Sequence, residues 1–399
     1  MKKTLLVILI ASLIATAIYV YQSQTAYNSL KELLSALQKT LNIDDKSKIS
    51  TEKTAAKNTK HFKKTRPVTR NRYFSGVSLP VGKMKIKWIY RTNGRIAASP
   101  TFDRGHLLFP SLDENFYAIS AKTGAKIWSR PLGSNSKSTP TVIKNVAYIG
   151  CNDHHLYAFK ADNGKPLWKF KTVGKITASP TCYLGSVYVG SHDHYFYCVD
   201  ATTGKQKWKW KTGGVIQSAA SINSKLVYFG SDDFHIYALH RVTGKVKWRF
   251  TTKGKIKGAP ILYGSSLIFT SEDNNVYCIQ RNSGVLKWMF SCEGEIVASP
   301  TLSKDFAYIA SIDHHLYAIS AKDSGLKWKF KADGPLLASA AVTKDFVCFT
   351  TKRGSVYFVD RNGKKLSSFH TKKTIESSPW LHKNTTYFTS HNRHLYAIE

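Results

Sequence analysis

Histidine and aspartate stand side by side at regularly spaced points of the sequence, a combination that can bind a metal ion or respond to pH. The groups are Asp153-His154-His155, His192-Asp193-His194 and Asp313-His314-His315, with His235, His391 and His394 at related positions. His154, His194 and His314 are therefore the candidate metal ligands. The alternative is structural, because Asp, Asn and His tolerate the left-handed backbone of hairpin tips, and a repeated tip would repeat them.

Cysteine gives no recognisable site. The six cysteines are Cys151, Cys182, Cys198, Cys278, Cys292 and Cys348, and none lies in a CxxC or CxxCH spacing. Structural zinc, thioredoxin-like chemistry and c-type haem attachment are therefore not supported. GxSxG, HExxH and Walker sequences are absent as well. We expect scattered core thiols, with one or two disulfides as the alternative in an oxidising compartment.

The formal net charge of +34 indicates an acidic partner or surface, high solubility, or both. Lysines alternate with aromatic residues in KWKWK and KWKFK, at 207, 209, 211 and at 327, 329, 331. Lysine protects outermost strands from pairing with other chains, which is one interpretation. The other is a surface for a polyanion, such as anionic lipid, an acidic polymer, nucleic acid or an acidic protein. An exported location and the lack of a nucleic-acid-binding motif argue against nucleic acid.

Three series of residues recur with a period of 40 and define the elements that carry these side chains. The tryptophans are Trp88, Trp128, Trp168, Trp208, Trp248, Trp288 and Trp328. Twelve residues after each tryptophan position stands Pro or Ala, at 100, 140, 180, 220, 260, 300, 340 and, one residue early, 379. Tyrosines lie at 117, 157, 197, 237, 277, 317, 357 and 396. A fixed period of this length indicates a solenoid or a propeller. A tryptophan repeated in this way is expected in the core and not in a cofactor site.

One unit, residues 177–214, contains four predicted strands. They are the short Ser-Pro-Thr segment, then SVYVGS, YFYCVD and KQKWKWK, each rich in β-branched and aromatic residues. A tight hairpin, SHDHY, joins the second and third, and Gly204 supplies a positive φ in the turn before the fourth. Four strands in 40 residues form a propeller blade.

The number of units predicts how the ring closes. Eight tyrosines and eight Pro/Ala positions indicate eight blades, and KLSSFH near Ser367 is the last outer strand before the final unit. The final unit lacks an outer strand, whereas a single outer strand, KMKIKWIY, precedes the first. Pairing the two removes the free edges. We therefore predict an all-β, eight-bladed β-propeller over residues 83–399, with four-stranded blades, closed by the N-terminal strand.

The N-terminal part has the features of an export signal. Lys2 and Lys3 precede an uncharged apolar run from Leu5 to Tyr21, so residues 1–21 are predicted to be a signal peptide or a transmembrane anchor. Residues 22–45 are expected to form a short amphipathic helix. Residues 46–82 are predicted to form a disordered basic linker. This linker is either a simple tether or a contact for anionic headgroups. The expected location is outside the cytoplasm, in the periplasm or on the envelope side, and an uncleaved segment 5–21 would anchor the chain in the inner membrane.

The run GSHDHYFYCVDATTGKQKW, like SIDHHLYAISAKDSGLKW, resembles the pyrroloquinoline-quinone-like (PQQ-like) β-propeller repeat. The resemblance covers residues 84–399. That family includes quinoprotein dehydrogenases and the non-enzymatic BamB type of outer-membrane assembly factor, to which the chain is similar in size and plan. Quinoprotein dehydrogenases carry adjacent cysteines and long insertions, and this sequence has neither.

The resemblance therefore implies a non-catalytic scaffold that binds protein partners in the cell envelope, as a monomeric propeller and without a cofactor. Two alternatives stay open. One is a quinoprotein-like enzyme or metal protein that holds PQQ or calcium in the central funnel. The other is a protein that binds an acidic polymer or a membrane surface through its basic rim and linker.

Overall fold

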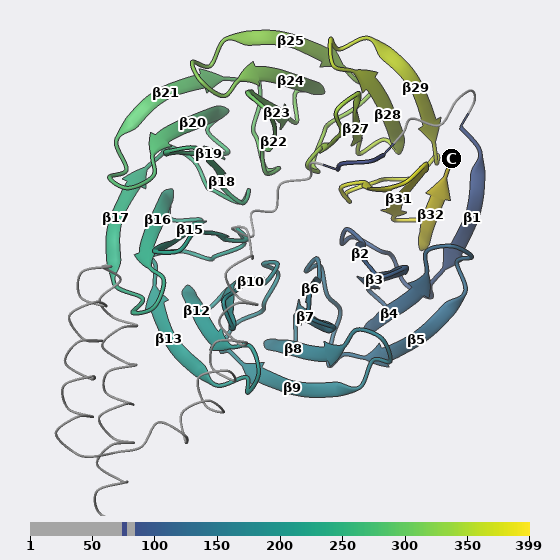
Figure 1. The fold of residues 1–399 in the computed structure, drawn as a ribbon, viewed down its shortest axis with the longest axis horizontal. Coiled ribbons are helices and arrows are strands. Elements are labelled where there is room, and N and C mark those ends of the chain that lie inside the picture. Colours follow the sequence, from purple (N-terminus) through teal and green to yellow (C-terminus); the bar gives the residue numbers. More distant parts are fainter. Residues whose placement is uncertain (1–73, 78–83) are drawn as a thin grey trace, which may run out of the picture. The chain divides into compact units, whose positions relative to one another are not determined.

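The computed structural model describes residues 74–77 and 84–399, which form an all-β, eight-bladed propeller. Each blade is a four-stranded antiparallel sheet, and the blades stand in a ring around a central axis (Figure 1). The described residues contain no helix. The predicted fold class is thus confirmed.

The strands of each blade run in sequence order from the axis outward, and we call these positions A to D. Blade 1 is β2 (Thr101–Asp103), β3 (His106–Pro110), β4 (Asn115–Ser120) and β5 (Lys126–Pro131); blade 2 is β6 (Thr141–Ile143), β7 (Val146–Gly150), β8 (His155–Lys160) and β9 (Pro166–Lys171). Blade 3 is β10 (Thr181–Tyr183), β11 (Ser186–Gly190), β12 (Tyr195–Asp200) and β13 (Gln206–Lys211); blade 4 is β14 (Ser221–Ile222), β15 (Leu226–Gly230), β16 (His235–His240) and β17 (Val246–Thr251).

The second half repeats this order. Blade 5 is β18 (Ile261–Tyr263), β19 (Ser266–Thr270), β20 (Asn275–Gln280) and β21 (Leu286–Ser291); blade 6 is β22 (Thr301–Ser303), β23 (Phe306–Ala310), β24 (His315–Ser320) and β25 (Leu326–Lys331). Blade 7 is β26 (Ala341–Val342), β27 (Phe346–Thr350), β28 (Ser355–Asp360) and β29 (Lys365–His370). Blade 8 is β30 (Trp380–His382), β31 (Thr385–Ser390), β32 (His394–Ile398) and, at its outer edge, β1 (Ile86–Arg91).

The first and last strands close the ring. Strand β1 pairs antiparallel with β32, with Ile89 opposite Tyr396 and Tyr90 opposite Leu395. Lys85 and Glu399 extend the pairing through two backbone hydrogen bonds of 2.8 and 2.9 Å. Blade 8 is therefore completed by a strand from the start of the propeller, as the count of units predicts.

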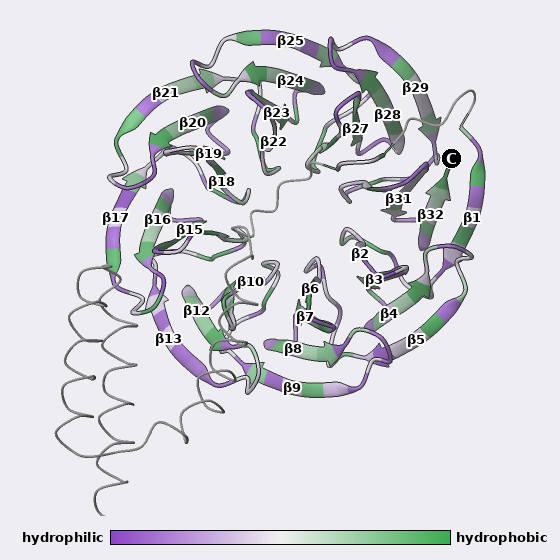
Figure 2. Ribbon diagram, viewed as in Figure 1, coloured by the Kyte–Doolittle hydropathy of each residue, from purple (hydrophilic) through white to green (hydrophobic). Residues whose placement is uncertain are grey.

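The hydrophobic core consists of layers between neighbouring blades. Between blades 3 and 4, for example, Phe196 stacks on Phe229 with ring centroids 3.8 Å apart, both fully buried. Figure 2 shows hydrophobic residues on the inner and middle strands and an alternation of hydrophilic and hydrophobic residues on the outer strands. The outer-strand lysines Lys207, Lys209 and Lys211 are exposed, so one face of strand D points to solvent.

The repeated tryptophans fasten each blade to the next. Each indole N–H donates a hydrogen bond to a backbone carbonyl 33 residues later, in the following blade: Trp88 to Ala121, Trp128 to Ala161, Trp168 to Ala201, Trp208 to Arg241, Trp248 to Arg281, Trp288 to Ala321 and Trp328 to Arg361. In most of these contacts a turn glycine lies directly against the ring; a Cβ on Gly204 would come within 2.7 Å of Trp168. In blade 7 a serine, Ser367, holds the corresponding D-strand position.

Residues 74–77 belong to the segment 46–82 that we expected to be a linker, yet they contact the propeller. The backbone N–H of Phe74 donates to the carbonyl of Val342 at 2.8 Å, and the Phe74 ring meets Trp380 edge-on at 5.2 Å. The predicted signal or anchor segment 1–21, the helix 22–45 and the rest of 46–82 lie outside the described residues. Within the described part, no helix has the length and apolar character needed to cross a bilayer.

Candidate functional site

The hairpin between strands B and C carries a polar clamp that recurs around the ring. In blade 3, Asp193 Oδ1 accepts the backbone N–H of Tyr195 at 2.9 Å. Its Oδ2 accepts the Tyr197 hydroxyl at 2.8 Å and the backbone N–H of Val173 at 3.0 Å. Val173 lies in the loop that arrives from blade 2, so a single carboxylate holds the hairpin and the incoming loop together.

The same clamp is made by Asp113, Asp153, Asp233, Asp273 and Asp313, each with the tyrosine four residues later. Burial opposes ionisation of Asp153, but hydrogen bonds from Tyr157 and neighbouring groups outweigh it and lower the pKa of the carboxyl. Burial, followed by the bond to the carboxylate, raises the pKa of Tyr157. These are structural uses of acid and phenol groups. The Asp-x-x-x-Tyr spacing in six units is the sequence signal of this clamp, and the tyrosine series alone does not reveal it.

Blades 7 and 8 depart from the clamp. In blade 7, Arg353 stands at the aspartate position, and the carboxylate comes from the incoming loop, where Asp333 accepts a 2.6 Å hydrogen bond from Ser355. In blade 8 the position is Asn392, whose amide donates to the Tyr396 hydroxyl at 2.5 Å. The two blades beside the closure therefore present different side chains at the same face.

The candidate metal ligands lie at the tips of these hairpins. His154, His194 and His314 have φ values of 71°, 69° and 73°, so all three adopt the left-handed backbone. Their backbone carbonyls accept hydrogen bonds from the N–H groups of Thr172, Thr212 and Ala332. Each imidazole belongs to a different blade. Among residues 74–77 and 84–399, no three His, Cys, Asp or Glu side chains lie together in an arrangement that could hold a metal ion.

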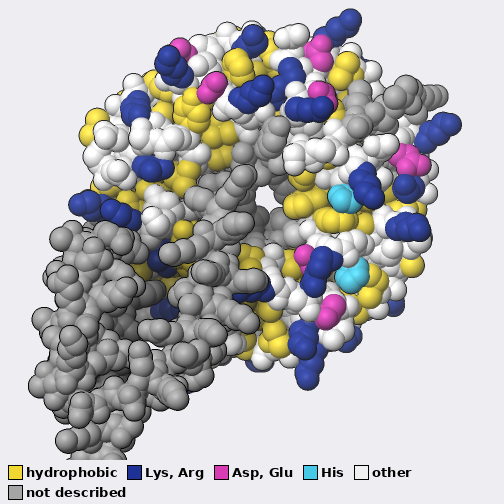
Figure 3. Space-filling model, in the orientation of Figure 1, with side chains coloured by type: hydrophobic (Ala, Val, Ile, Leu, Met, Phe, Trp, Pro, Cys, Tyr) yellow, Lys and Arg dark blue, Asp and Glu magenta, His cyan; other side chains and the backbone are white. Residues whose placement is uncertain are grey.

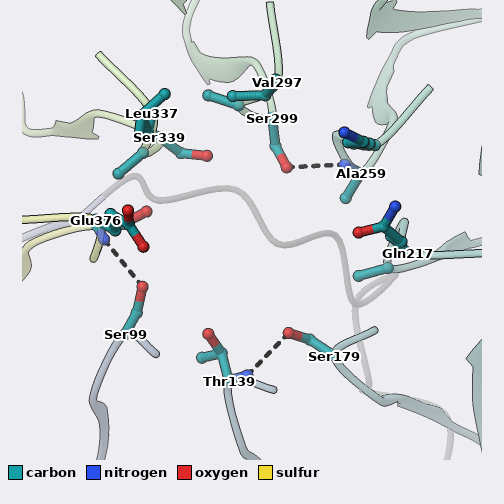
Figure 4. Close-up of a pocket in the computed structure, with 15 residues that line it drawn as sticks. Ser99, Thr139, Ser179, Gln217, Ala259, Val297, Ser299, Leu337, Ser339 and Glu376 are labelled. Carbon is teal, nitrogen blue, oxygen red and sulfur yellow. Dashed lines mark hydrogen bonds between the residues drawn. The ribbon is translucent and has the colours of Figure 1, made fainter. Parts of the chain in front are cut away.

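The axis of the propeller is lined by small hydroxyl side chains, which lie just before the innermost strands and converge on the cavity in Figure 4. Ser179 accepts the backbone N–H of Thr139 at 3.0 Å, and Ser299 accepts that of Ala259 at 2.8 Å. Ser99 accepts the N–H of Ser378 at 2.9 Å, which links blade 8 to blade 1. The cavity there has a volume of about 180 Å³.

A second ring of side chains surrounds this cavity on the face of the B–C hairpins. Gln217 donates to Asp232 at 3.0 Å, and the His192 ring bonds the Thr177 hydroxyl at 2.8 Å. Lys257 lies 2.5 Å from Glu272. His391 and Glu376 approach within 3.2 Å. The polar groups around the axis are therefore largely paired with each other.

The resemblance to quinoproteins implies PQQ and calcium in the central funnel. The residues that line the axial cavity show whether PQQ would fit there. PQQ is a tricarboxylate, so its site needs several cationic groups. Lys257 is the basic residue that lines the cavity, and Glu272 already pairs with it, while Glu376 adds a negative charge. The volume is below the roughly 300–1,000 Å³ of usual ligand sites. These residues do not fit the quinone.

The six cysteines are free thiols, and all are buried. Burial raises the pKa of Cys151 to about 12 and that of Cys198 to about 11. A buried thiol with a raised pKa is a poor nucleophile and a poor metal ligand. Of the two expectations for cysteine, the structure thus has scattered core thiols.

The two ends of the blades differ in charge. The A–B hairpins carry basic residues in most blades: Arg104, Lys144, Lys225, Lys304, Lys344 and Lys383. The B–C hairpins at the opposite face carry the six clamp aspartates. In the view of Figure 3, lysine and arginine side chains spread over the visible face and its margin, and acidic ones are few. The positive charge predicted for the rim thus extends onto one face of the propeller.

Two family models match the chain, and they overlap along the ring. The model described as the β-propeller of the beta-alanine-activating enzyme matches residues 185–399, more than half of the chain. The model described as outer membrane protein assembly factor BamB matches residues 81–250. No curated protein matches the chain by sequence.

Solved structures share the fold at low identity. BamB from Moraxella catarrhalis has a TM-score of 0.68 at 16% identity, over 79% of this chain and 99% of that one. The computationally designed Ika8 protein has 0.69 at 13%, over 77% and 96%. The quinohemoprotein alcohol dehydrogenase from Comamonas testosteroni has 0.69 at 14%, over 82% and 78%. At these identities the likeness shows the fold.

The ring of four-stranded blades agrees with the first model's description as a β-propeller. Together the models span residues 81–399. The chain therefore belongs to the β-propeller family that the first model describes, and its repeats are of the PQQ-like type.

Proposed function

We propose that this protein is a non-catalytic scaffold of the cell envelope, which binds protein partners on the faces of its propeller. The proposal rests on the hydrogen-bond partners of the recurring polar groups. The indole N–H groups, the clamp carboxylates and the ring around the axis bond within the propeller, so they are not available for chemistry. Loops at the two faces remain for contact with a partner.

The location rests on the N-terminal sequence. An apolar run behind two lysines would export the propeller, and an uncleaved run at residues 5–21 would anchor it in the inner membrane. The BamB model supports an envelope role, because its description is of an outer-membrane assembly factor. The partners are then other envelope proteins.

The main alternative function is that of a quinoprotein-like enzyme, because a quinohemoprotein alcohol dehydrogenase shares the fold. Thermal unfolding of the purified protein with calcium and increasing PQQ separates the two, because a ligand that binds the folded state raises its melting temperature. We expect no change beyond that of calcium alone. A saturable rise with PQQ would overturn the scaffold proposal.

Site-specific photo-cross-linking in intact envelopes tests the scaffold directly. Val173 is 82% exposed on the loop beside the B–C hairpins, and Val285 is 59% exposed on the C–D loop at the opposite face. A cross-linker at the face that binds a partner should give one discrete adduct, and the other position serves as its control. Equal, diffuse labelling from both positions would contradict a specific scaffold.

A second function is favoured by the unequal charge of the two faces. The basic A–B hairpins and outer-strand lysines would bind an anionic membrane surface, at about 1 kcal/mol for each basic residue close to it. Co-sedimentation with anionic and neutral vesicles tests this. Binding that is confined to anionic vesicles and falls steeply with salt supports it, and binding that ignores vesicle charge rejects it.

A further inference from the structure

On the face of the A–B hairpins, side chains cross from one blade to the next at several places, and we call each line where two blades meet a groove. The Arg241 guanidinium lies over the ring of Tyr183 at 5.4 Å, across blades 3 and 4. Arg361 lies over Tyr308 at 5.0 Å, across blades 6 and 7. Arg281 donates to the carbonyl of Gly264 within its own blade 5. All three arginines hold the same position, the first residue of the C–D turn.

Other residues bridge two more grooves. Between blades 5 and 6 the Tyr263 hydroxyl donates to Asp305 at 2.8 Å. Between blades 1 and 2 Arg104 donates to Asn145. In four grooves of the ring the space between the blades is thus crossed by side chains of the protein itself.

The groove at the closing seam, between blades 8 and 1, is different. Alanine stands at the arginine position here, as it does at 161, 201 and 321, and a cavity of about 350 Å³ remains at the seam. Its lining residues are Lys87, Phe102, Gly105, Ala121, Lys122, His382, Lys383, Thr385 and Tyr387. The cavity lies between β1, β30 and β31 on one side and β2 and the turns of blade 1 on the other, where the first and last parts of the propeller meet.

Aromatic rings form the walls of this cavity. Phe102 and His382 stack with ring centroids 4.2 Å apart and an interplanar angle of 24°. Burial, assisted by Lys383, lowers the pKa of His382, which favours the neutral ring. The Tyr387 hydroxyl and the Trp88 indole N–H both donate to the carbonyl of Ala121, at 3.1 and 3.2 Å, which fixes their rings. The walls are therefore preorganised.

Three lysines surround this aromatic cavity. Lys87 pairs with Glu399 at 2.7 Å. Lys122 and Lys383 are exposed at its mouth, and within the described residues their ammonium groups have no carboxylate partner. A rigid apolar slot with two unneutralised cations at its opening is complementary to a flat apolar group that carries a negative charge.

We propose that the seam cavity binds a small aromatic anion, with its ring against Phe102, His382 and Tyr387 and its carboxylate or phosphate held by Lys122 and Lys383. This proposal is independent of the scaffold function proposed above. The volume suits a ligand of one or two fused rings, at the lower end of the usual range for ligand sites.

Calorimetric titration of the full-length protein with 2-naphthoate tests the proposal. We expect saturable binding at one site, and binding of the uncharged analogue 2-naphthalenemethanol at least about tenfold weaker. No saturable binding of the acid, or equal affinity for the alcohol, would overturn it.

Ala121→Arg supplies the matched variant, because arginine already occupies this position at three other grooves of the same ring. The added side chain should cross the seam cavity and abolish binding while the melting temperature stays close to that of the parent protein. Unchanged affinity in a folded Ala121→Arg protein would place any binding elsewhere and reject the seam.

A second set of variants tests the charge. Lys122→Gln combined with Lys383→Gln should weaken naphthoate binding about tenfold. Lys322→Gln is the control, because Lys322 holds the position of Lys122 in blade 6, beside the groove that Tyr263 and Asp305 bridge. If the control weakens binding as much as the double variant, the effect is one of net charge and the proposed contacts are wrong.

Discussion

The hydroxyl of Tyr197 donates a 2.8 Å hydrogen bond to the carboxylate of Asp193, whose same oxygen accepts the backbone N–H of Val173 at 3.0 Å. One acidic side chain thus joins a hairpin of blade 3 to the loop that comes from blade 2. The tyrosine ring is buried, and its hydroxyl lies in a part-buried hydrogen bond. The bond should therefore contribute to stability beyond the packing of the ring.

Tyr197→Phe removes this bond and keeps the ring. We expect the free energy of unfolding to fall by about 1–3 kcal/mol, because a half-buried carboxylate oxygen loses one of its two donors. Asp193→Ala should cost at least as much. In a double-mutant cycle by chemical denaturation, the two changes should be clearly non-additive.

The control is Tyr195→Phe, two residues away on the same strand. Tyr195 is half-buried, and its ring contacts the ammonium group of Lys209 at 4.4 Å. Its hydroxyl plays no part in the clamp, so we expect a loss below about 0.5 kcal/mol. Equal losses at 195 and 197 would refute the clamp.

The blades were predictable because each is nearly a copy of the others, so weak local signals add up in phase. The eighth outer strand was found although Ser367 replaces tryptophan, since position in the repeat identified it. The clamp was not predicted, although aspartate stands four residues before tyrosine in six units. Its partners, such as Val173, lie 20 residues upstream and contribute a backbone N–H, which any residue has.

Gly204 and Gly185 form a matched pair for separating backbone strain from packing. Their φ values are 73° and 72°, so alanine at either site is strained by about 1–2 kcal/mol. At Gly204 the new Cβ would also fall within 2.7 Å of the Trp168 ring, whereas at Gly185 nothing lies within 4 Å. Gly204→Ala should therefore destabilise the protein by about 1–3 kcal/mol more.

Denaturation curves of the two alanine variants give this difference directly. Tryptophan fluorescence of Gly204→Ala should also shift, because the Trp168 indole must move away from the turn. Equal stability of the two variants would mean that the contact with Trp168 has no energetic weight.

His192 makes the stability depend on pH. Burial lowers its pKa below the ordinary 6.5, with Asp232 opposing and Lys175 assisting the shift. The unfolded chain then binds a proton at a higher pH than the folded protein does, so this residue destabilises the fold as pH falls below 6.5. We expect the free energy of unfolding to decline on acidification from pH 7 to 5.5.

His192→Asn should flatten that decline, because asparagine occupies the equivalent position in blade 2, as Asn152, and does not titrate. Stability measured at several pH values in both proteins provides the comparison. An identical pH slope would assign the decline to other groups, such as His382 and His394, whose pKa values burial also lowers.

The seam cavity could not be derived from the repeat, for a physical reason. Alanine stands at the position of Ala121 in four units, so the alanine alone does not make the cavity. The cavity depends on the side chains that meet at the seam, such as Phe102 and His382, which lie on strands from opposite ends of the propeller. Periodicity identifies what all blades share, whereas these side chains belong to one interface. The difference in charge between the two faces likewise requires the strand order, because that order assigns each hairpin to a face.

The strand that closes the ring has a consequence for the order of assembly. Seven blades are built from consecutive strands, so each can form from a short stretch of chain. Blade 8 must join Ile86–Arg91 to His394–Ile398, across nearly the whole length of the propeller. Until that late event, β1 and β32 each present an unpaired edge that can bind another chain. The slow, concentration-sensitive step of refolding should therefore be the meeting of these two strands.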